Sequence, residues 1–401
     1  MLKRVALGVS AFLVLATHAQ AMEFSFDAYV DLRLVVPPDE VSWLDGGLGK
    51  ARYGSAQPSP NFRFAEAAGQ GTLAITDDLH AVTVLRLEPR QPTGVDILET
   101  YLSWRPQAEG DWRWSVKAGA FFPPISVEND DLGWTSPYTL TPSAIDSWVG
   151  NELRTIGGEA DVAWTGGYGT LTAIGSLYCC NEPAGVLIAD RGWTLDDRPM
   201  GLLERVRIPN ATAALFGMPV PSRTGMFENI DDHVGWYTGL KWDVRDAGQL
   251  AVLWYDNNAD PEAFTARDTS WRTHFWAASL KAHPFGVTVL AQGMTGDTVI
   301  EAFGYHYTDF QSAFLLLSYD IDDWRVSGRA DVFQTRTRPA FTLLDEDGHA
   351  FTVAVSWSPE DWLRLTGELL DVESRRTERA LIGVAPEQSS TQFQMSARVF
   401  L

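Results

Sequence analysis

The chain has 401 residues, enough for two or three soluble domains or for one large barrel. Its formal net charge is −21, which argues against nucleic acid as a partner, because phosphates favour a basic surface. The two cysteines, Cys179 and Cys180, are adjacent, so they exclude a framework of several disulfides and leave either two loop thiols or one vicinal bridge.

The first 21 residues have the pattern of a secretory signal peptide. Lys3 and Arg4 precede an apolar run over residues 5–16, and Ala19-Gln20-Ala21 forms a small-residue cleavage site. The run is shorter than the roughly 20 apolar residues of a spanning helix, which disfavours a membrane anchor. No later segment reaches about 18 uninterrupted apolar residues, so the mature chain is either a periplasmic protein or an outer-membrane β-barrel.

Residues 24–34 alternate between apolar and polar side chains. Phe24 and Phe26 share one face, whereas Asp27 and Asp31 share the other. A transmembrane barrel strand has this pattern, with apolar residues toward lipid and polar residues toward a wet interior, but a soluble β-sandwich has it too. Residues 393–401 alternate in the same way and resemble the C-terminal strand of outer-membrane barrels, although that strand usually ends in an aromatic rather than in leucine.

We predict about sixteen strands, an even number as single-chain bacterial barrels require. They span residues 24–34, 64–75, 79–88, 95–105, 112–121, 152–165, 169–178, 235–244, 249–256, 271–282, 287–295, 310–319, 324–334, 350–357, 362–371 and 389–401. The connections alternate between short and long, which is typical of a barrel with periplasmic turns and external loops, and only residues 89–94 are short on the loop side.

Tryptophans gather close to the predicted turns, in the apolar phase of the strands. They are Trp104, Trp112, Trp164, Trp242, Trp324 and Trp357. A ring of aromatics at one rim is the girdle that a membrane interface favours. Residues 22–401 are therefore expected to form an all-β fold, a transmembrane antiparallel β-barrel of about sixteen strands.

The segment from residue 119 to 152 has neither a helical nor a strand period. Its prolines at positions 123, 124, 137 and 142 argue against a regular element, yet it contains five aromatic residues. Residues 122–151 form the third external loop by strand count, and long loops of this kind are usually functional. We expect the loop to fold into the barrel and narrow the pore; an external lid or a subunit contact is the alternative.

A pore constriction with acids on one side and cations on the other sorts solutes by size and charge. The loop supplies the acids, and strand positions in the lumen-facing phase supply the cations. The predicted constriction residues are Glu128, Asp130, Asp131, Asp146, Arg33, Arg113, Lys117, Arg325, Arg329 and Arg364. Lumen-phase acids almost balance the cations of the wall, so no ion preference follows from the sequence.

Other motifs give weaker signals. The acids of "ENDDLG" at residues 128–133 could bind Ca²⁺, but solvated or arginine-paired carboxylates are the better interpretation. The glycine-rich residues 45–54 lack the serine or threonine of a phosphate loop and are expected to form a flexible surface loop. No histidine lies in a nucleophile motif, so we predict no catalytic residue, no cofactor, no metal and no enzymatic activity.

The stretches "SWLDGGLGKARYG", "FFPPISVEND", "GWTSPYTLTPSAIDSWVGNELRTIG" and "RGWTLDD" resemble a family of porin-like outer-membrane proteins of Gram-negative bacteria. The family is known mainly from uncharacterised sequences and is distantly similar to general and phosphate-selective porins. The resemblance implies a β-barrel, an outer-membrane location in contact with lipid, and a possible homotrimer.

The sequence therefore predicts a porin-like channel for passive diffusion of small hydrophilic solutes or ions. The alternative is a structural or surface-binding outer-membrane barrel whose lumen is closed by its loops. A TonB-dependent receptor is disfavoured because no plug domain precedes the predicted barrel.

Overall fold

The computed structural model describes residues 22–180, 182–211, 223–265, 269–301, 306–338 and 343–401. The predicted signal peptide, residues 1–21, lies outside the described residues. Among the described helices, none is both long and apolar enough to cross a membrane.

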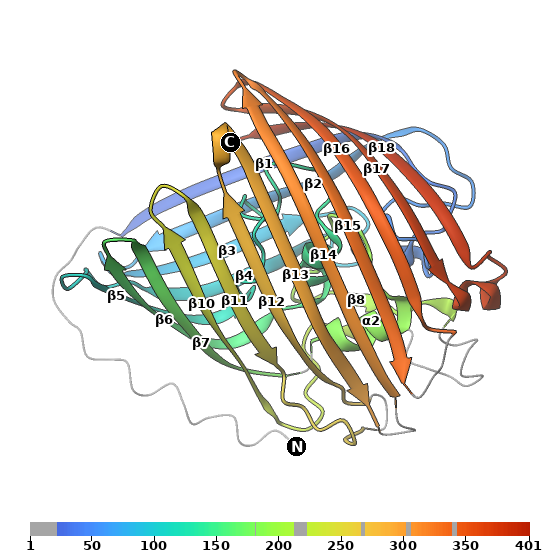
Figure 1. Ribbon diagram of the computed structural model, residues 1–401, viewed down its shortest axis with the longest axis horizontal. Coiled ribbons are helices and arrows are strands. Elements are labelled where there is room, and N and C mark those ends of the chain that lie inside the picture. The colour runs from blue at the N-terminus through green and yellow to red at the C-terminus, as the bar shows by residue number, and fades with distance from the viewer. Residues whose placement is uncertain (1–21, 181, 212–222, 266–268, 302–305, 339–342) are drawn as a thin grey trace.

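Sixteen antiparallel strands form a closed barrel, in which β1 pairs with β18 (Figure 1). Each predicted strand corresponds to one strand of this barrel, so the predicted fold class is confirmed. The barrel strands are β1 (Glu23–Val36), β2 (Asn61–Ala74), β3 (Leu79–Leu87), β4 (Val95–Trp104), β5 (Trp112–Phe121), β6 (Thr155–Gly166), β7 (Gly169–Cys179), β10 (Val234–Val244), β11 (Gly248–Asp256), β12 (Arg272–Ala282), β13 (Val287–Ile300), β14 (His306–Ile321), β15 (Trp324–Arg338), β16 (Glu346–Glu360), β17 (Leu363–Arg376) and β18 (Glu387–Phe400).

The remaining described elements are short and lie in the connections. They are the helices α1 (Ala144–Glu152) and α2 (Ala184–Arg191), the 3-10 turns η1 (Trp43–Asp45), η2 (Pro284–Gly286) and η3 (Thr377–Ile382), and a two-stranded sheet of β8 (Arg205–Arg207) and β9 (Arg223–Gly225). Cys179 and Cys180, at the end of β7, form a disulfide with each other, so the vicinal bridge is the correct one of the two alternatives.

The outer face of the barrel carries the apolar side chains. In β1, Phe24 and Phe26 are exposed, whereas Asp31 and Arg33 are buried on the inner face. All six tryptophans of the predicted girdle are exposed near the turns, and Trp324 stacks on Trp357 of the neighbouring strand. The strands therefore present an apolar belt of the kind that a bilayer requires.

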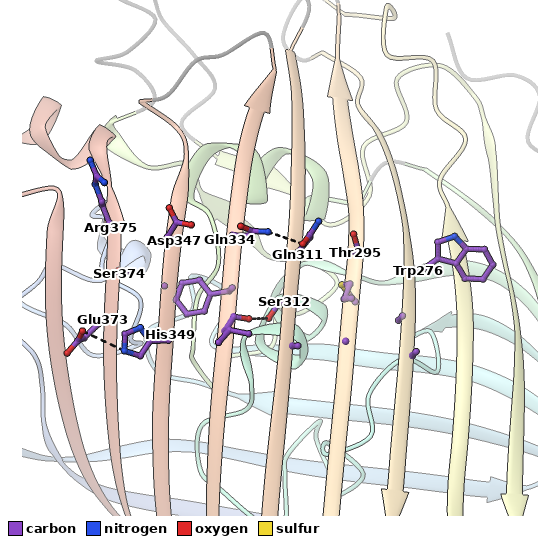
Figure 2. A pocket seen from close by; sticks show the side chains of 18 of the residues that line it. Trp276, Thr295, Gln311, Ser312, Gln334, Asp347, His349, Glu373, Ser374 and Arg375 are labelled. Atoms are coloured by element: carbon purple, nitrogen blue, oxygen red, sulfur yellow. Dashed lines mark hydrogen bonds and ion pairs between the residues drawn. The ribbon is translucent and has the colours of Figure 1, made fainter.

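Strands β13–β18 continue past this belt at the loop end of the barrel. On β16 the outward side chains change from Val353 and Phe351 to His349 and Asp347. Figure 2 shows the polar side chains of this region, which line an outer-face cavity of about 1210 Å³. The tall strands thus extend beyond the apolar belt, where polar side chains can face water.

The loop end of the barrel is filled by three segments, residues 37–60, 122–154 and 182–204 (Figure 1). Trp148 of α1 packs against Phe275 and Phe310 of the inner wall, each with ring centroids 5.3 Å apart, and Trp193 joins the same cluster. The expectation of a flexible surface loop at residues 45–54 is wrong, because Lys50–Tyr53 are buried inside this packing.

Candidate functional site

Helix α1 ends the predicted constriction loop, where we expected no regular element. The prolines all precede it, and Ser143 caps it by accepting a hydrogen bond from Asp146 N at 3.1 Å. The pattern Ser143-x-x-Asp146 at the start of this segment is a signal for the beginning of a helix, and it could have predicted α1. The following strand consequently begins at Thr155 rather than at residue 152.

Three acids of the loop lie beside cations of the wall. Glu128 Oε2 is 3.2 Å from Arg329 Nη1 of β15, and Asp130 Oδ2 is 3.0 Å from Lys281 Nζ of β12. Asp131 Oδ2 lies 3.1 Å from Arg364 Nη1 of β17. Because each acid meets a different cation, the paired interpretation of "ENDDLG" describes these carboxylates better than a calcium site.

Arg329 is the most extensively bonded of these cations. Besides Glu128, its guanidinium donates to Asp331 Oδ2 at 2.8 Å and to the carbonyl oxygens of Thr141 and Pro142 at 2.7 and 2.9 Å. Five donors in a planar fork suit arginine to such a set of oxygen acceptors. The loop is therefore held against β15 by one fully buried side chain.

Wall carboxylates hold the loop backbone from the other direction. Glu368 of β17 accepts hydrogen bonds from Thr141 N and Thr141 Oγ1, at 3.0 and 2.6 Å. Asp331 accepts from Ala144 N at 3.2 Å, at the start of α1. The bond from Ala144 N satisfies an amide that the helix itself leaves unpaired, and the bonds from Thr141 hold the loop just before the helix.

Asp146 does not lie across the lumen from a cation. It is buried in the first turn of α1, and burial together with the neighbouring Glu128 raises its pKa well above the ordinary value. A proton on Asp146 relieves the repulsion between the two carboxyl groups. This residue belongs to the packing of the loop rather than to a charged pore surface.

Three of the other four predicted constriction cations pair with acids outside the loop. Arg33 pairs with Asp31 at 2.9 Å and with Asp197, and Lys117 pairs with Glu159 at 2.9 Å. Arg325 pairs with Asp320 at 2.6 Å, although it also donates to Pro137 O of the loop at 3.0 Å. Arg113 is exposed near the turn end of β5.

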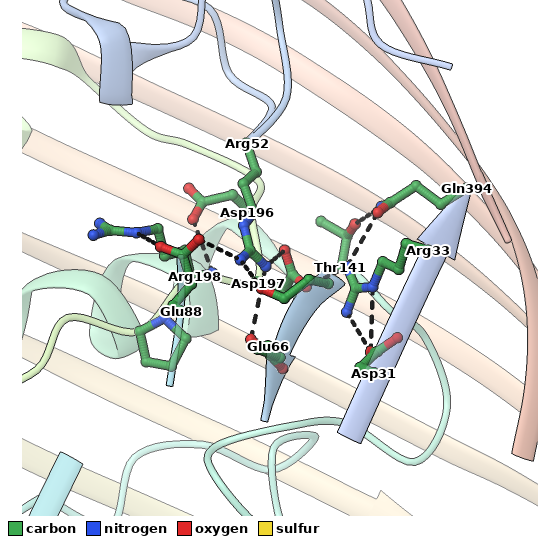
Figure 3. Close-up of polar contacts among 12 residues, drawn as sticks. Asp31, Arg33, Arg52, Glu66, Glu88, Thr141, Asp196, Asp197, Arg198 and Gln394 are labelled. Carbon is green, nitrogen blue, oxygen red and sulfur yellow. Dashed lines mark hydrogen bonds and ion pairs between the residues drawn. The ribbon is translucent and has the colours of Figure 1, made fainter. Parts of the chain in front are cut away.

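A second ionic cluster, which we did not predict from the sequence, lies over β1–β3 (Figure 3). Arg52 Nη1 is 3.1 Å from Asp197 Oδ1, which joins residues 37–60 to residues 182–204. Arg198 Nε is 2.9 Å from Glu88 Oε2, and Arg86 Nε donates to Glu66 Oε2 at 3.0 Å. Glu66 and Arg86 occupy lumen-facing positions of adjacent strands, which was the available sequence signal.

The arginines of this cluster keep Asp197 and Glu88 ionised. Burial opposes the charged form of Asp197, but the guanidinium groups of Arg33, Arg52 and Arg86 outweigh that penalty and lower its pKa. The pKa of Glu88 is lowered to about 2 against the same penalty, by Arg52 and Arg198. The cluster is therefore a set of paired charges that hold two loop segments against the wall.

Space remains on both sides of loop residues 124–131. One cavity of about 240 Å³ extends along β6, β7 and β10–β12, and another of about 350 Å³ faces β2–β4. Pro124 and Ser126 line both of them. The loop thus divides the interior without filling it at this level.

Three solved structures of similar fold are distant from this chain in sequence. The outer-membrane channel DcaP of Acinetobacter baumannii is 9% identical, with a TM-score of 0.61 over 96% of this chain and 100% of the other. The anion-selective porin of Comamonas acidovorans is 11% identical, with a TM-score of 0.53 over 95% and 100%. The OmpT trimer form of Vibrio cholerae is 9% identical, with a TM-score of 0.51 over 95% and 100%.

The chain has the fold of the outer-membrane porins. No protein-family model and no curated protein matches the sequence. The porin-like resemblance is confirmed in the architecture of the barrel, and at this level of identity it extends to the fold alone.

Proposed function

We propose that this protein is an outer-membrane channel for passive diffusion of small hydrophilic solutes or ions, narrowed by residues 122–151. The observation that carries the proposal is the set of pairs Glu128–Arg329, Asp130–Lys281 and Asp131–Arg364, which join the loop to three strands of the inner wall. A wide barrel discriminates among small solutes only when something narrows it, and opposed charges then act on whatever passes.

A closed barrel with a structural or surface-binding role is the second candidate. The buried packing of residues 37–60 and 182–204 at the loop end supports it, because Trp193 and Arg52 have no more than 1% exposure there. Ion pairs such as Arg52–Asp197 would then seal the barrel rather than frame a passage.

Single-channel recording in planar bilayers separates the two candidates. The purified full-length protein is expected to give ohmic conductance steps. A folded barrel that inserts into the bilayer and remains silent would overturn the channel and favour the closed barrel.

Deletion of residues 126–147 tests the narrowing role. This segment contains Glu128, Asp130 and Asp131, so its removal is expected to raise the unit conductance and the size limit for solutes. If the shortened barrel folds and both quantities stay unchanged, the constriction lies elsewhere. Heat-dependent gel mobility reports whether the barrel has folded.

We also propose assembly as a homotrimer. The similar Vibrio cholerae protein is described in a trimer form, which supports the proposal by analogy. Cross-linking in native membranes is expected to give a three-chain species, and a uniform monomer would contradict it.

A further inference from the structure

We infer that the passage beside residues 124–131 conducts cations in preference to anions. The inference rests on the proposed channel and names the class of solute that it would carry. It concerns the two cavities that Pro124 and Ser126 separate, of about 240 and 350 Å³.

The ionisable residues that line these cavities are mostly acids. Glu99, Asp130 and Asp131 line the larger cavity, whereas Glu159 and Asp161 line the smaller one together with Lys241. Within the described part of the chain, Lys241 is the one lysine or arginine in either lining. Rings and clusters of carboxylates of this kind favour cations in pores.

Ion pairing does not cancel this excess at Asp130 and Asp131, because each of these acids is more exposed than the cation it pairs with. The side chain of Asp130 is 52% exposed and that of Lys281 26%, while Asp131 is 34% exposed and Arg364 23%. The carboxylate oxygens of Asp130 and Asp131 are therefore more accessible to water than the cations they pair with. The pair Lys117–Glu159 has the opposite order, with the lysine more exposed.

The cations nearer the loop end do not offset the effect. Arg329 and Arg33 have side-chain exposures of 0%, and each pairs with two carboxylates. Their charge is neutralised within the packing, and they offer a passing anion no open donor. A permeant cation, in contrast, can exchange part of its hydration shell for the oxygens of Asp130 and Asp131.

The test measures the reversal potential in a planar bilayer under a KCl gradient, with the full-length protein. We expect a potassium-to-chloride permeability ratio several-fold above one. The double substitution Asp130→Asn with Asp131→Asn is expected to lower that ratio several-fold, because it removes two carboxylates and frees Lys281 and Arg364.

The matched control is Glu373→Gln with Glu387→Gln. These acids lie on the outer face of β17 and β18, so the control changes net charge equally without touching the lumen. The ratio is expected to stay unchanged there. An equal fall in the control would overturn the assignment to the cavities.

Acidification of the unmodified protein is a second measurement, independent of whether the double variant folds. The permeability ratio should fall as the pH is lowered, because protonation removes the negative charge of the carboxyl groups that line the cavities. Two outcomes in a conducting protein would overturn this inference alone: a preference for chloride, or a potassium-to-chloride permeability ratio that does not change on acidification. A folded protein without conductance overturns the channel and this inference together.

Discussion

Arg329 Nη1 of β15 lies 3.2 Å from Glu128 Oε2 of the loop over residues 122–151, and neither side chain is exposed. Glu128 also accepts a hydrogen bond from Ser143 N, just before α1. Glu128 therefore links the barrel wall to the start of α1, since it contacts both Arg329 and Ser143 N. A buried ion pair of this kind is costly to break from one side, since the remaining charge is left without a partner.

We expect Arg329→Met to lower the free energy of unfolding by about 3–5 kcal/mol, because Glu128 and Asp331 would remain buried without their cation. Urea titration of the refolded barrel measures this change. The control is Arg336→Met on the outer face of the same strand, whose partner Asp347 is exposed, with an expected change below about 1 kcal/mol. Equal losses in the two variants would contradict the role of the buried pair.

The buried carboxyl of Glu182, between β7 and α2, predicts a loss of stability as the pH rises from about 4.5 to about 8. Burial raises its pKa from the ordinary 4.5 to about 8. A raised carboxyl pKa contributes stability that is fully present below pH 4.5 and is lost as the pH rises through about 8. Within that window, each pH unit removes up to about 1.4 kcal/mol.

The variant Glu182→Gln isolates this contribution. Its unfolding free energy, measured by urea titration from pH 5 to 9, should fall less steeply with pH than that of the parent protein. Asp190 of α2 also has a pKa raised to about 8 by burial, so part of the slope is expected to remain. Identical slopes in parent and variant would rule out Glu182 as a source.

Gly192, directly after α2, has a φ of +71°, and a Cβ there would collide with Glu346. Gly192→Ala is expected to destabilise the barrel by several kcal/mol, because backbone strain of about 1–2 kcal/mol adds to the displacement of Glu346. Gly383→Ala is the control, since Gly383 has a similar φ of +75° but open space around its Cβ position. Urea titration should show a clearly larger loss at Gly192.

The apolar belt predicts different costs for two arginine substitutions on β16. Val353→Arg would place a charge in the belt and is expected to cost about 2–4 kcal/mol. His349→Arg, four residues toward the loop end, lies beside Glu373 and should cost about 0–1 kcal/mol. Unfolding titrations in lipid vesicles measure both free-energy changes. Similar losses in the two variants would contradict the conclusion that the apolar belt ends between residues 353 and 349.

The wall of the barrel could be predicted because its signal is local. Along residues 24–34, side chains of period two place Asp31 and Arg33 on one face regardless of which strands lie alongside. Short turns then force antiparallel neighbours, so the number and order of the strands follow from the spacing of the segments. The signal for helix α1 is also local, because Ser143 caps it from the preceding position. We did not predict the helix because we took the prolines, which all precede it, as evidence against a regular element anywhere in residues 119–152.

The interior could not be predicted in the same way. Arg329 and Glu128 are 201 residues apart in the chain, and no period relates them. Residues 45–54 have the glycines and charges of a surface loop, yet Lys50 and Arg52 find buried partners in Glu346 and Asp197. Burial of a charge depends on a partner from another segment, which composition does not reveal.

The sequence by itself therefore determined the sixteen-stranded wall, its apolar outer face and the set of side chains that point inward, because all three depend on neighbours along one strand. The tertiary structure decided which of those side chains meet. It brought Glu128, Asp130 and Asp131 to cations of three different strands, whereas Arg33 was paired with Asp197 of another loop. Closure of the barrel makes such distant residues neighbours, and only then do their charges pair.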